Sequence, residues 1–186
     1  MNNMFFTRKG DNGETSFFHC DQRFSKSSEL AEALGAVDEI NSLLGFCKVK
    51  SGDLGFKICD LRILEIINQV QQDLFIIQAS LSGADKKLSE EKIKKLEKII
   101  DAAEKEMPEI KSFFISGGTE LSALFDYARA VCRSAERAVV SLKEKEPEKV
   151  SPEILSYLNR LSSLLYALAR FVNFKAKIEE QPPLYE

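Results

Sequence analysis

Residues 119–147 read TELSALFDYARAVCRSAERAVVSLKEKEP. Apolar side chains recur every three or four positions along this stretch, a spacing that places them on one side of an α-helix. They are Leu121, Leu124, Ala128, Val131, Ala135, Val139 and Leu142. Thr119 is a favourable N-cap residue, and Pro147 prevents further propagation of a helix. The stretch therefore predicts one long amphipathic helix from about Thr119 to about Glu146.

Four other segments have the same periodicity, and most of the connections between them are short. Such amphipathic helices favour an antiparallel bundle. The additional predicted helices cover about residues 29–48, 54–81, 89–107 and 151–177. The sequence thus indicates an all-α fold, a five-helix antiparallel bundle with the up-down arrangement of ferritin-like proteins. A single domain of residues 1–186 would comprise an extended N-terminal loop (1–28), the bundle (29–177) and a tail (178–186).

Composition narrows the class of protein. The chain has 186 residues, enough to bury one substantial core. A formal net charge of −3 argues against a nucleic-acid-binding protein with a wholly basic surface, although it permits a local cationic pocket. No segment approaches the ~18 apolar residues of a membrane span, and the N-terminus lacks the pattern of a signal peptide. We therefore expect a cytoplasmic protein that binds neither nucleic acid nor membrane.

The four cysteines include no C-x-x-C pair and lie mostly within helical patterns. They are Cys20, Cys47, Cys59 and Cys132. This pattern favours buried free thiols over disulfides or a zinc site. The single histidine, His19, lies outside the helices, and the chain has no Glu-x-x-His pair for a di-metal site of the ferritin type. The sequence therefore predicts no metal site built by the protein.

The N-terminal loop contains a polar stretch with two glycines, TRKGDNGETSF, residues 7–17. Closely spaced glycines let the backbone approach an anion, while hydroxyl and cationic side chains add donors and charge. Phosphate binding is the functional interpretation. The alternative is a surface hairpin with a tight turn at residues 11–13, which the loop alone favours. The Walker A pattern is absent from the chain.

Arginines border the apolar stripe of the predicted helix at 119–146. At 100° per residue, Arg133 lies about 40° from Arg129, and Glu136 lies about 20° to the other side of Arg129. Arg137 falls a little beyond Arg133. Arginine presents a fixed fork of donors that suits phosphate oxygens or a carboxylate. A solvated charged face is the alternative, but such a face more often mixes lysines with glutamates.

Three polar residues lie on the edges of other predicted helices. Asn159 occupies an edge of the last helix similar to that of the arginines. Asn41 points almost into the apolar stripe of the first helix, so we favour a structural hydrogen-bond node over a site residue. Asp38 is either an exposed acid or the partner of an arginine from another helix or another chain.

Five blocks of the sequence, taken in order, resemble the PduO-type cob(I)alamin adenosyltransferases. They are TRKGDNGETS, RFSK, EALGAVDEINSLLG, FFISGGT followed by ARAVCRSAER, and YLNRLSSLLYALARFVN. Together they extend from Thr7 to about Asn173. Any one block is weak evidence, but five in the right order and spacing are highly specific.

The resemblance implies an enzyme that transfers the 5′-deoxyadenosyl group of ATP to the cobalt of cob(I)alamin or a related corrinoid, with release of triphosphate. It also implies a homotrimer with ATP and corrinoid bound at the subunit interfaces. Mg²⁺ and an electron-donating flavoprotein would serve the reaction. The alternatives are a catalytically silent sensor or carrier that binds nucleotide or corrinoid, and a purely structural bundle.

By the same resemblance, ATP would contact the N-terminal loop and the last two helices. The implied ATP-binding residues are Thr7, Arg8, Lys9, Gly10, Thr15, Ser16, Lys26, Arg133, Ser134, Ala135, Glu136, Arg137 and Asn159. Arg129 would pair with Asp38 across the interface, and both would join Arg133 in catalysis. Phe113 would press on the lower face of the corrinoid and displace its axial base. Three residues depart from the family pattern: Ser116 for proline, Asp126 for histidine and Ser163 for aspartate.

Overall fold

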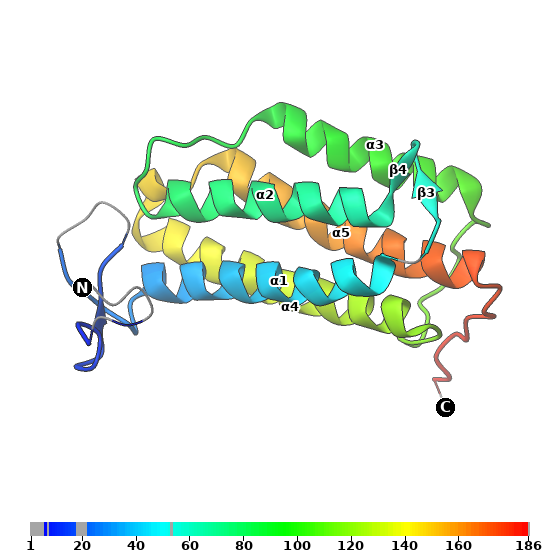
Figure 1. The fold of residues 1–186 in the computed structure, drawn as a ribbon, viewed down its shortest axis with the longest axis horizontal. Coiled ribbons are helices and arrows are strands. Elements are labelled where there is room, and N and C mark those ends of the chain that lie inside the picture. Colours follow the sequence, from blue (N-terminus) through cyan, green and yellow to red (C-terminus); the bar gives the residue numbers. More distant parts are fainter. Residues whose placement is uncertain (1–5, 7, 18–21, 53, 186) are drawn as a thin grey trace.

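The computed structural model describes residues 6, 8–17, 22–52 and 54–185. Within them, five α-helices form a bundle in which each helix runs opposite to the one before it (Figure 1). They are α1 (Glu29–Ser51), α2 (Ile63–Leu81), α3 (Glu90–Glu106), α4 (Glu120–Lys145) and α5 (Pro152–Lys175). The predicted five-helix bundle is confirmed. The short elements are β1 (Glu14–Thr15), β2 (Phe24–Ser25), β3 (Lys57–Ile58), β4 (Leu61–Arg62) and the 3-10 helix η1 (Pro147–Lys149).

Helix α4 lies at the centre of the packing, against α1 and α5, while α2 packs on α1 and α3 on α5. Its predicted apolar stripe is buried except for Leu124, which is partly exposed. The Oγ1 of Thr119 accepts a hydrogen bond from the Ser122 amide at 3.1 Å, so Thr119 is the N-cap as predicted. No helix in the described part of the chain is both long and apolar enough to cross a membrane.

The predicted start of the second helix, near Leu54, is wrong. A two-stranded hairpin of β3 and β4 occupies residues 57–62, and α2 begins only at Ile63. The turn residues Cys59 and Asp60 have φ values of 52° and 64°, which a right-handed helix cannot contain. A capping box with Glu65 then starts α2, because the Glu65 carboxylate accepts the Arg62 amide at 2.9 Å.

A buried polar cluster joins three helices inside the bundle. The carboxylate of Asp73, on α2, is 1% exposed and accepts hydrogen bonds from Gln69 Nε2 and the Tyr157 hydroxyl, each at 3.0 Å. Lys92 of α3 forms an ion pair with the same carboxylate. Burial, followed by the nearby Asp73 charge, raises the pKa of Tyr157 well above its usual value, so the phenol stays protonated and donates.

The Asn41 side chain does not form the predicted structural node. Its Oδ1 atom is buried without a hydrogen-bond partner among the described residues. Only its backbone carbonyl is bonded to a side chain, by Gln71 Nε2 at 3.0 Å. An unpaired buried carbonyl oxygen costs free energy.

Thiol accessibility differs between the cysteines. Cys47 and Cys132 are buried, which raises the pKa of each thiol to about 12, whereas Cys59 is exposed at the β3–β4 turn. The predicted burial is therefore wrong for Cys59, and Cys20 and His19 lie outside the described residues. We expect iodoacetamide to label Cys59 in the native protein but Cys47 and Cys132 only after denaturation, as measured by peptide mass spectrometry. Rapid native labelling of Cys132 would contradict the packing of α4 against α5.

Candidate functional site

The arginines of α4 border a cavity of about 470 Å³, named here the arginine cavity. The end of α3, the turn that follows it, α4 and α5 supply its walls. The lining residues are Ile100, Glu104, Met107, Ile110, Phe113, Phe114, Ser116, Asp126, Arg129, Arg133, Ser162, Ser163, Tyr166 and Ala167. The structure thus brings Phe113, from the turn before α4, together with Arg129 and Arg133, which share one edge of α4. Phe114 and Tyr166 were not predicted, because only helix packing shows that α5 faces the turn.

Two arginines and a phenylalanine in this cavity have polar or apolar groups that no described residue satisfies. The Nε atom of Arg129 is buried and has no hydrogen-bond partner in the described residues. Arg133 is exposed, and no hydrogen bond or ion pair joins it to another described residue. Phe113 lines the same cavity and is 75% exposed, although phenylalanine is usually buried. A ligand or a second chain with an anionic group and an apolar face would satisfy all three.

Further along α4, hydrogen bonds hold two of the predicted ATP-binding residues together. Asn159 Nδ2 donates to the Glu136 carboxylate at 3.0 Å, which joins α5 to α4. Arg160 donates to Asn159 Oδ1 at 2.8 Å and to the Glu97 carboxylate of α3 at 2.8 Å. These contacts fix the Asn159 amide group in one orientation, as a binding residue requires.

The remaining predicted positions of α4 differ in exposure. Ser134 and Arg137 are exposed, and Arg137 Nη2 donates to Ser134 Oγ at 2.9 Å. Ala135 is fully buried in the core. Its methyl group therefore does not face a ligand on the surface, whereas Ser134 and Arg137 remain accessible.

The N-terminal loop contributes to a different cavity, of about 590 Å³, which lies against α1 and α2 and is named here the loop cavity. It is lined by Thr15, Ser16, Phe17, Lys26, Ala31, Leu34, Gly35, Asp38, Phe75, Gln78, Ala79 and Ser82. Asp38 is exposed, and its Oδ1 accepts a hydrogen bond from Gln78 Nε2 at 3.3 Å. Hydroxyl, ammonium and carboxylate groups therefore surround one hollow.

Lys26 holds the loop in its folded form. Its Nζ donates to the Gly10 carbonyl at 2.8 Å, and its backbone amide donates to the Gly13 carbonyl at 2.9 Å. Gly13 has a φ of +83°, which only glycine adopts without strain. Lys26 forms these bonds with neutral carbonyls, so its positive charge stays available to an anion in the loop cavity.

The predicted position of the tight turn within the loop is wrong. Strands β1 and β2 do pair, with Thr15 opposite Phe24, but residues 11–13 precede β1 instead of joining the two strands. Arg23 holds the start of the loop, since its Nη2 donates to the Glu14 carbonyl at 3.0 Å and also to the Lys9 carbonyl. Arg8 is exposed, and Thr7 lies outside the described residues.

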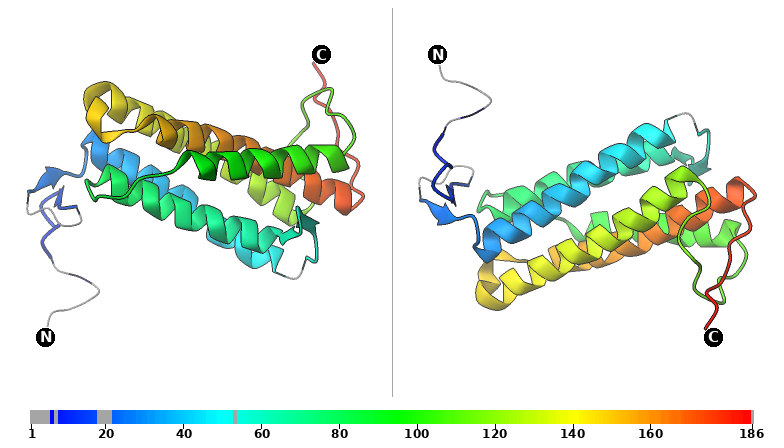
Figure 2. Two further views of the ribbon diagram at one scale, coloured as in Figure 1. Left: turned by 90° about the horizontal axis from the view of Figure 1, so that it is seen from above. Right: turned by 90° about the horizontal axis from the view of Figure 1, so that it is seen from below.

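Within one chain the two cavities are separate. Their linings share no residue. The turn that carries Phe113 lies at the opposite end of the bundle from the N-terminal loop (Figures 1 and 2). Asp38 and Arg129 line different cavities, so the predicted pair between them is not made within the described chain. Two half-sites on one molecule are the expected arrangement when copies of the chain complete each other's sites.

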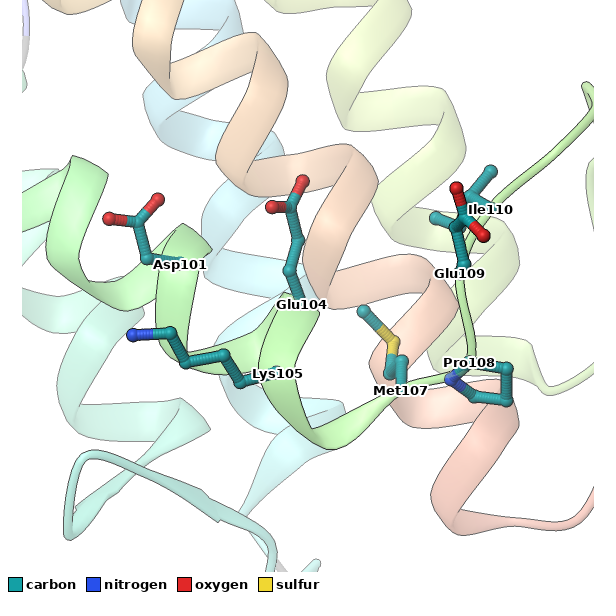
Figure 3. Close-up of a pocket in the computed structure, with 7 residues that line it drawn as sticks. All are labelled: Asp101, Glu104, Lys105, Met107, Pro108, Glu109 and Ile110. Atoms are coloured by element: carbon teal, nitrogen blue, oxygen red, sulfur yellow. The ribbon is translucent and has the colours of Figure 1, made fainter.

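A hollow of about 470 Å³ adjoins the arginine cavity at the end of α3 and shares Glu104, Met107 and Ile110 with it (Figure 3). The carboxylates of Asp101 and Glu104 point to the same side of α3 in Figure 3. Sequence reasoning missed this hollow, although acidic residues flank the Met-Pro pair that ends the helix. Carboxylates disfavour a phosphate here. In the described residues, no group of three or more His, Cys, Asp or Glu side chains is placed to hold a metal ion.

Comparisons with known proteins point to one family. A sequence profile described as cobalamin adenosyltransferase matches residues 5–172. The corrinoid adenosyltransferase of Bacillus subtilis is 37% identical over 178 residues, which cover 93% of this chain and 88% of that protein. The corrinoid adenosyltransferase PduO of Salmonella typhimurium is 34% identical over 172 residues, which cover 89% of this chain and 48% of that protein.

The bundle also matches a solved structure. A variant PduO-type ATP:corrinoid adenosyltransferase from Lactobacillus reuteri, complexed with cobalamin and ATP, aligns with a TM-score of 0.86 at 28% identity. The alignment covers 97% of each chain. The likeness therefore extends over nearly the whole of both chains.

Proposed function

The chain belongs to the cobalamin adenosyltransferase family, and from this premise we propose that it transfers the 5′-deoxyadenosyl group of ATP to the cobalt of cob(I)alamin or a related corrinoid. The arginine cavity carries the proposal. It places Arg129 and Arg133, neither of which pairs with a carboxylate among the described residues, next to the exposed ring of Phe113. The arginines suit an anionic nucleotide, and the exposed ring suits a large flat apolar ligand.

The chemistry requires no nucleophile from the protein. The cobalt of cob(I)alamin attacks the 5′ carbon of ATP with its electron pair, so a cobalt–carbon bond forms while the bond from that carbon to the phosphate oxygen breaks. The electron pair of the broken bond leaves with triphosphate. The protein then contributes positioning and stabilisation of the leaving group's charge, and guanidinium groups provide both. The buried thiols, with pKa values of about 12, play no nucleophilic part.

We assign the triphosphate to a composite site. Thr7, Arg8, Lys9, Gly10, Thr15, Ser16 and Lys26 from the loop of one copy would face Arg133, Ser134, Glu136, Arg137 and Asn159 of the next copy. Asp38 would pair with Arg129 across the same boundary. Its carboxylate would then accept a hydrogen bond from the buried Nε of Arg129 and balance the charge of the guanidinium group. A ring of three copies repeats this contact three times.

Phe113 is assigned to the corrinoid. Its exposed ring would press on the lower face of the macrocycle and exclude the axial base, which removes a donor from the cobalt and makes cob(II)alamin easier to reduce. A flavoprotein would supply the electron. Mg²⁺ would accompany ATP, and it has no ligand set among the described residues.

The decisive test is the absorbance spectrum of chemically reduced cobalamin mixed with the protein and Mg-ATP. We expect conversion to the spectrum of the adenosyl form, together with stoichiometric release of triphosphate. Omission of ATP is the control. If cob(I)alamin persists while the folded protein and ATP are both present, the chain is not an adenosyltransferase.

Ligand-induced stabilisation separates the enzyme from the alternatives. A purely structural bundle would show no shift in Tm with Mg-ATP, whereas a nucleotide at about 100 times its Kd adds about 2.7 kcal/mol of stability. A silent sensor would show the same shift without the spectral conversion. Arg129 Nε and Arg133 have no partner among the described residues, which favours a ligand-binding protein over a purely structural bundle.

A further inference from the structure

Arg170 of α5 is a buried cation that the proposed reaction does not use. Its side chain is 2% exposed, and its Nη2 donates to Asp126 Oδ2 at 2.6 Å. Its Nη1 lies 3.0 Å from Glu180 Oε1, an ion pair without the alignment of a hydrogen bond. A guanidinium ion in the core is costly unless it is paired, and two carboxylates meet that requirement here.

Both carboxylates also hold the turn that carries Phe113. Asp126 Oδ2 accepts the Gly117 amide at 3.4 Å. Glu180 Oε1 accepts from Asn173 Nδ2 at 2.7 Å, and the same Nδ2 donates to the Gly117 carbonyl at 2.8 Å. Because Asp126 and Asn173 bond both polar groups of Gly117, the end of the turn is fixed from α4 and from α5.

Close packing leaves this end of the turn little freedom. Gly118 has a φ of +102°, and a Cβ atom there would lie 2.5 Å from Asn173 Oδ1. The next residue, Thr119, donates its amide to that Oδ1 at 3.1 Å. The tail joins the turn as well, since the Ile115 amide donates to the Gln181 carbonyl at 2.9 Å.

Aromatic rings extend these contacts to the arginine cavity. The guanidinium carbon of Arg170 lies 5.8 Å from the Phe114 ring centroid and 5.1 Å from that of Tyr166. Phe114, Tyr166 and Asp126 all line the arginine cavity. Arg170 therefore contacts the wall of the cavity from behind, and Phe114 is the direct neighbour of Phe113.

We infer that Arg170 is a positioning residue for the corrinoid. It joins α4, α5, the tail and the 111–118 turn, and it thereby sets where the Phe113 ring stands against the macrocycle. The inference rests on the proposed function, and Arg170 itself touches neither substrate. Loss of its charge would let the turn move, which weakens corrinoid binding and leaves the nucleotide half of the site intact.

The test compares Arg170→Met and Arg170→Lys with Lys175→Met, a control that removes an ion-paired cation from the same helix. We expect Arg170→Met to raise the KM for the corrinoid about tenfold or more, with the KM for ATP unchanged. The fraction of cob(II)alamin that loses its axial base should fall in parallel. Arg170→Lys should recover part of both effects, since it keeps the charge but not the fork.

Glu180→Gln provides the second variant, because the amide oxygen still accepts from Asn173 while the ion pair is lost. We expect a smaller rise in the corrinoid KM and faster hydrogen exchange at the Ile115 amide. If Arg170→Met does not fold, Glu180→Gln decides. A folded variant with an unchanged corrinoid KM and unchanged Ile115 exchange would overturn the inference. An inactive wild-type protein would instead overturn the proposed function.

Discussion

Arg133→Ala should lower kcat by about 100-fold or more, because the substitution removes a fixed donor from the charge that develops on the triphosphate. Arg133 has no hydrogen bond or ion pair to another described residue, so its loss leaves no carboxylate among them without a partner. We therefore expect the Tm and the oligomeric state to stay close to those of the wild type. Single-turnover adenosylation, measured by absorbance, reports the loss directly.

Two matched variants sharpen this prediction. Arg62→Ala removes another exposed arginine, at the start of α2 and outside both cavities, and should leave kcat unchanged. Arg133→Lys keeps the charge but not the planar fork, so its rate should lie between those of the wild type and Arg133→Ala. A near-normal rate for Arg133→Ala would show that the leaving group is stabilised elsewhere.

Helix positions followed from the sequence because they depend on local pattern. The α4 stripe, its Thr119 cap and its end before Pro147 are all properties of consecutive residues. The β3–β4 hairpin was missed because Leu54, Leu61 and Leu64 continue a helical spacing across it. The turn residues Cys59 and Asp60 have positive φ, but this pair does not predict such a turn as strongly as Asn-Gly would. The interruption of the helical pattern at residues 57–62 therefore depends on tertiary packing.

The candidate site was only partly predictable. Helical geometry placed Arg129 and Arg133 on one edge of α4, and their roles came from the family resemblance. The contact of Asn159 with Glu136 requires the packing of α5 on α4, which no single segment encodes. The sequence did not indicate a role for Arg170. An arginine beside an apolar stripe is normally an exposed residue, and only the three-dimensional structure shows that Asp126 and Glu180 pair with this one in the core.

Subunit complementation should give the second large effect. By the proposed assignment, Lys26→Ala would impair the loop half-site and Arg133→Ala the helix half-site, so each variant alone should be nearly inactive. After the two are mixed in equal amounts and their subunits exchange, about one quarter of the interfaces combine an intact loop with an intact helix. We therefore expect about one quarter of the wild-type activity to return.

The proposed composite site predicts this recovery. Its basis is that the two cavities of one chain share no residue and that the Phe113 turn and the N-terminal loop lie at opposite ends of the bundle. If each chain closed its own site, every subunit in the mixture would carry one defect, and no activity would return. A mixture of wild-type chains with the double variant Lys26→Ala/Arg133→Ala separates the cases again. Sites between chains predict about one quarter of full activity, whereas sites within a chain predict about one half.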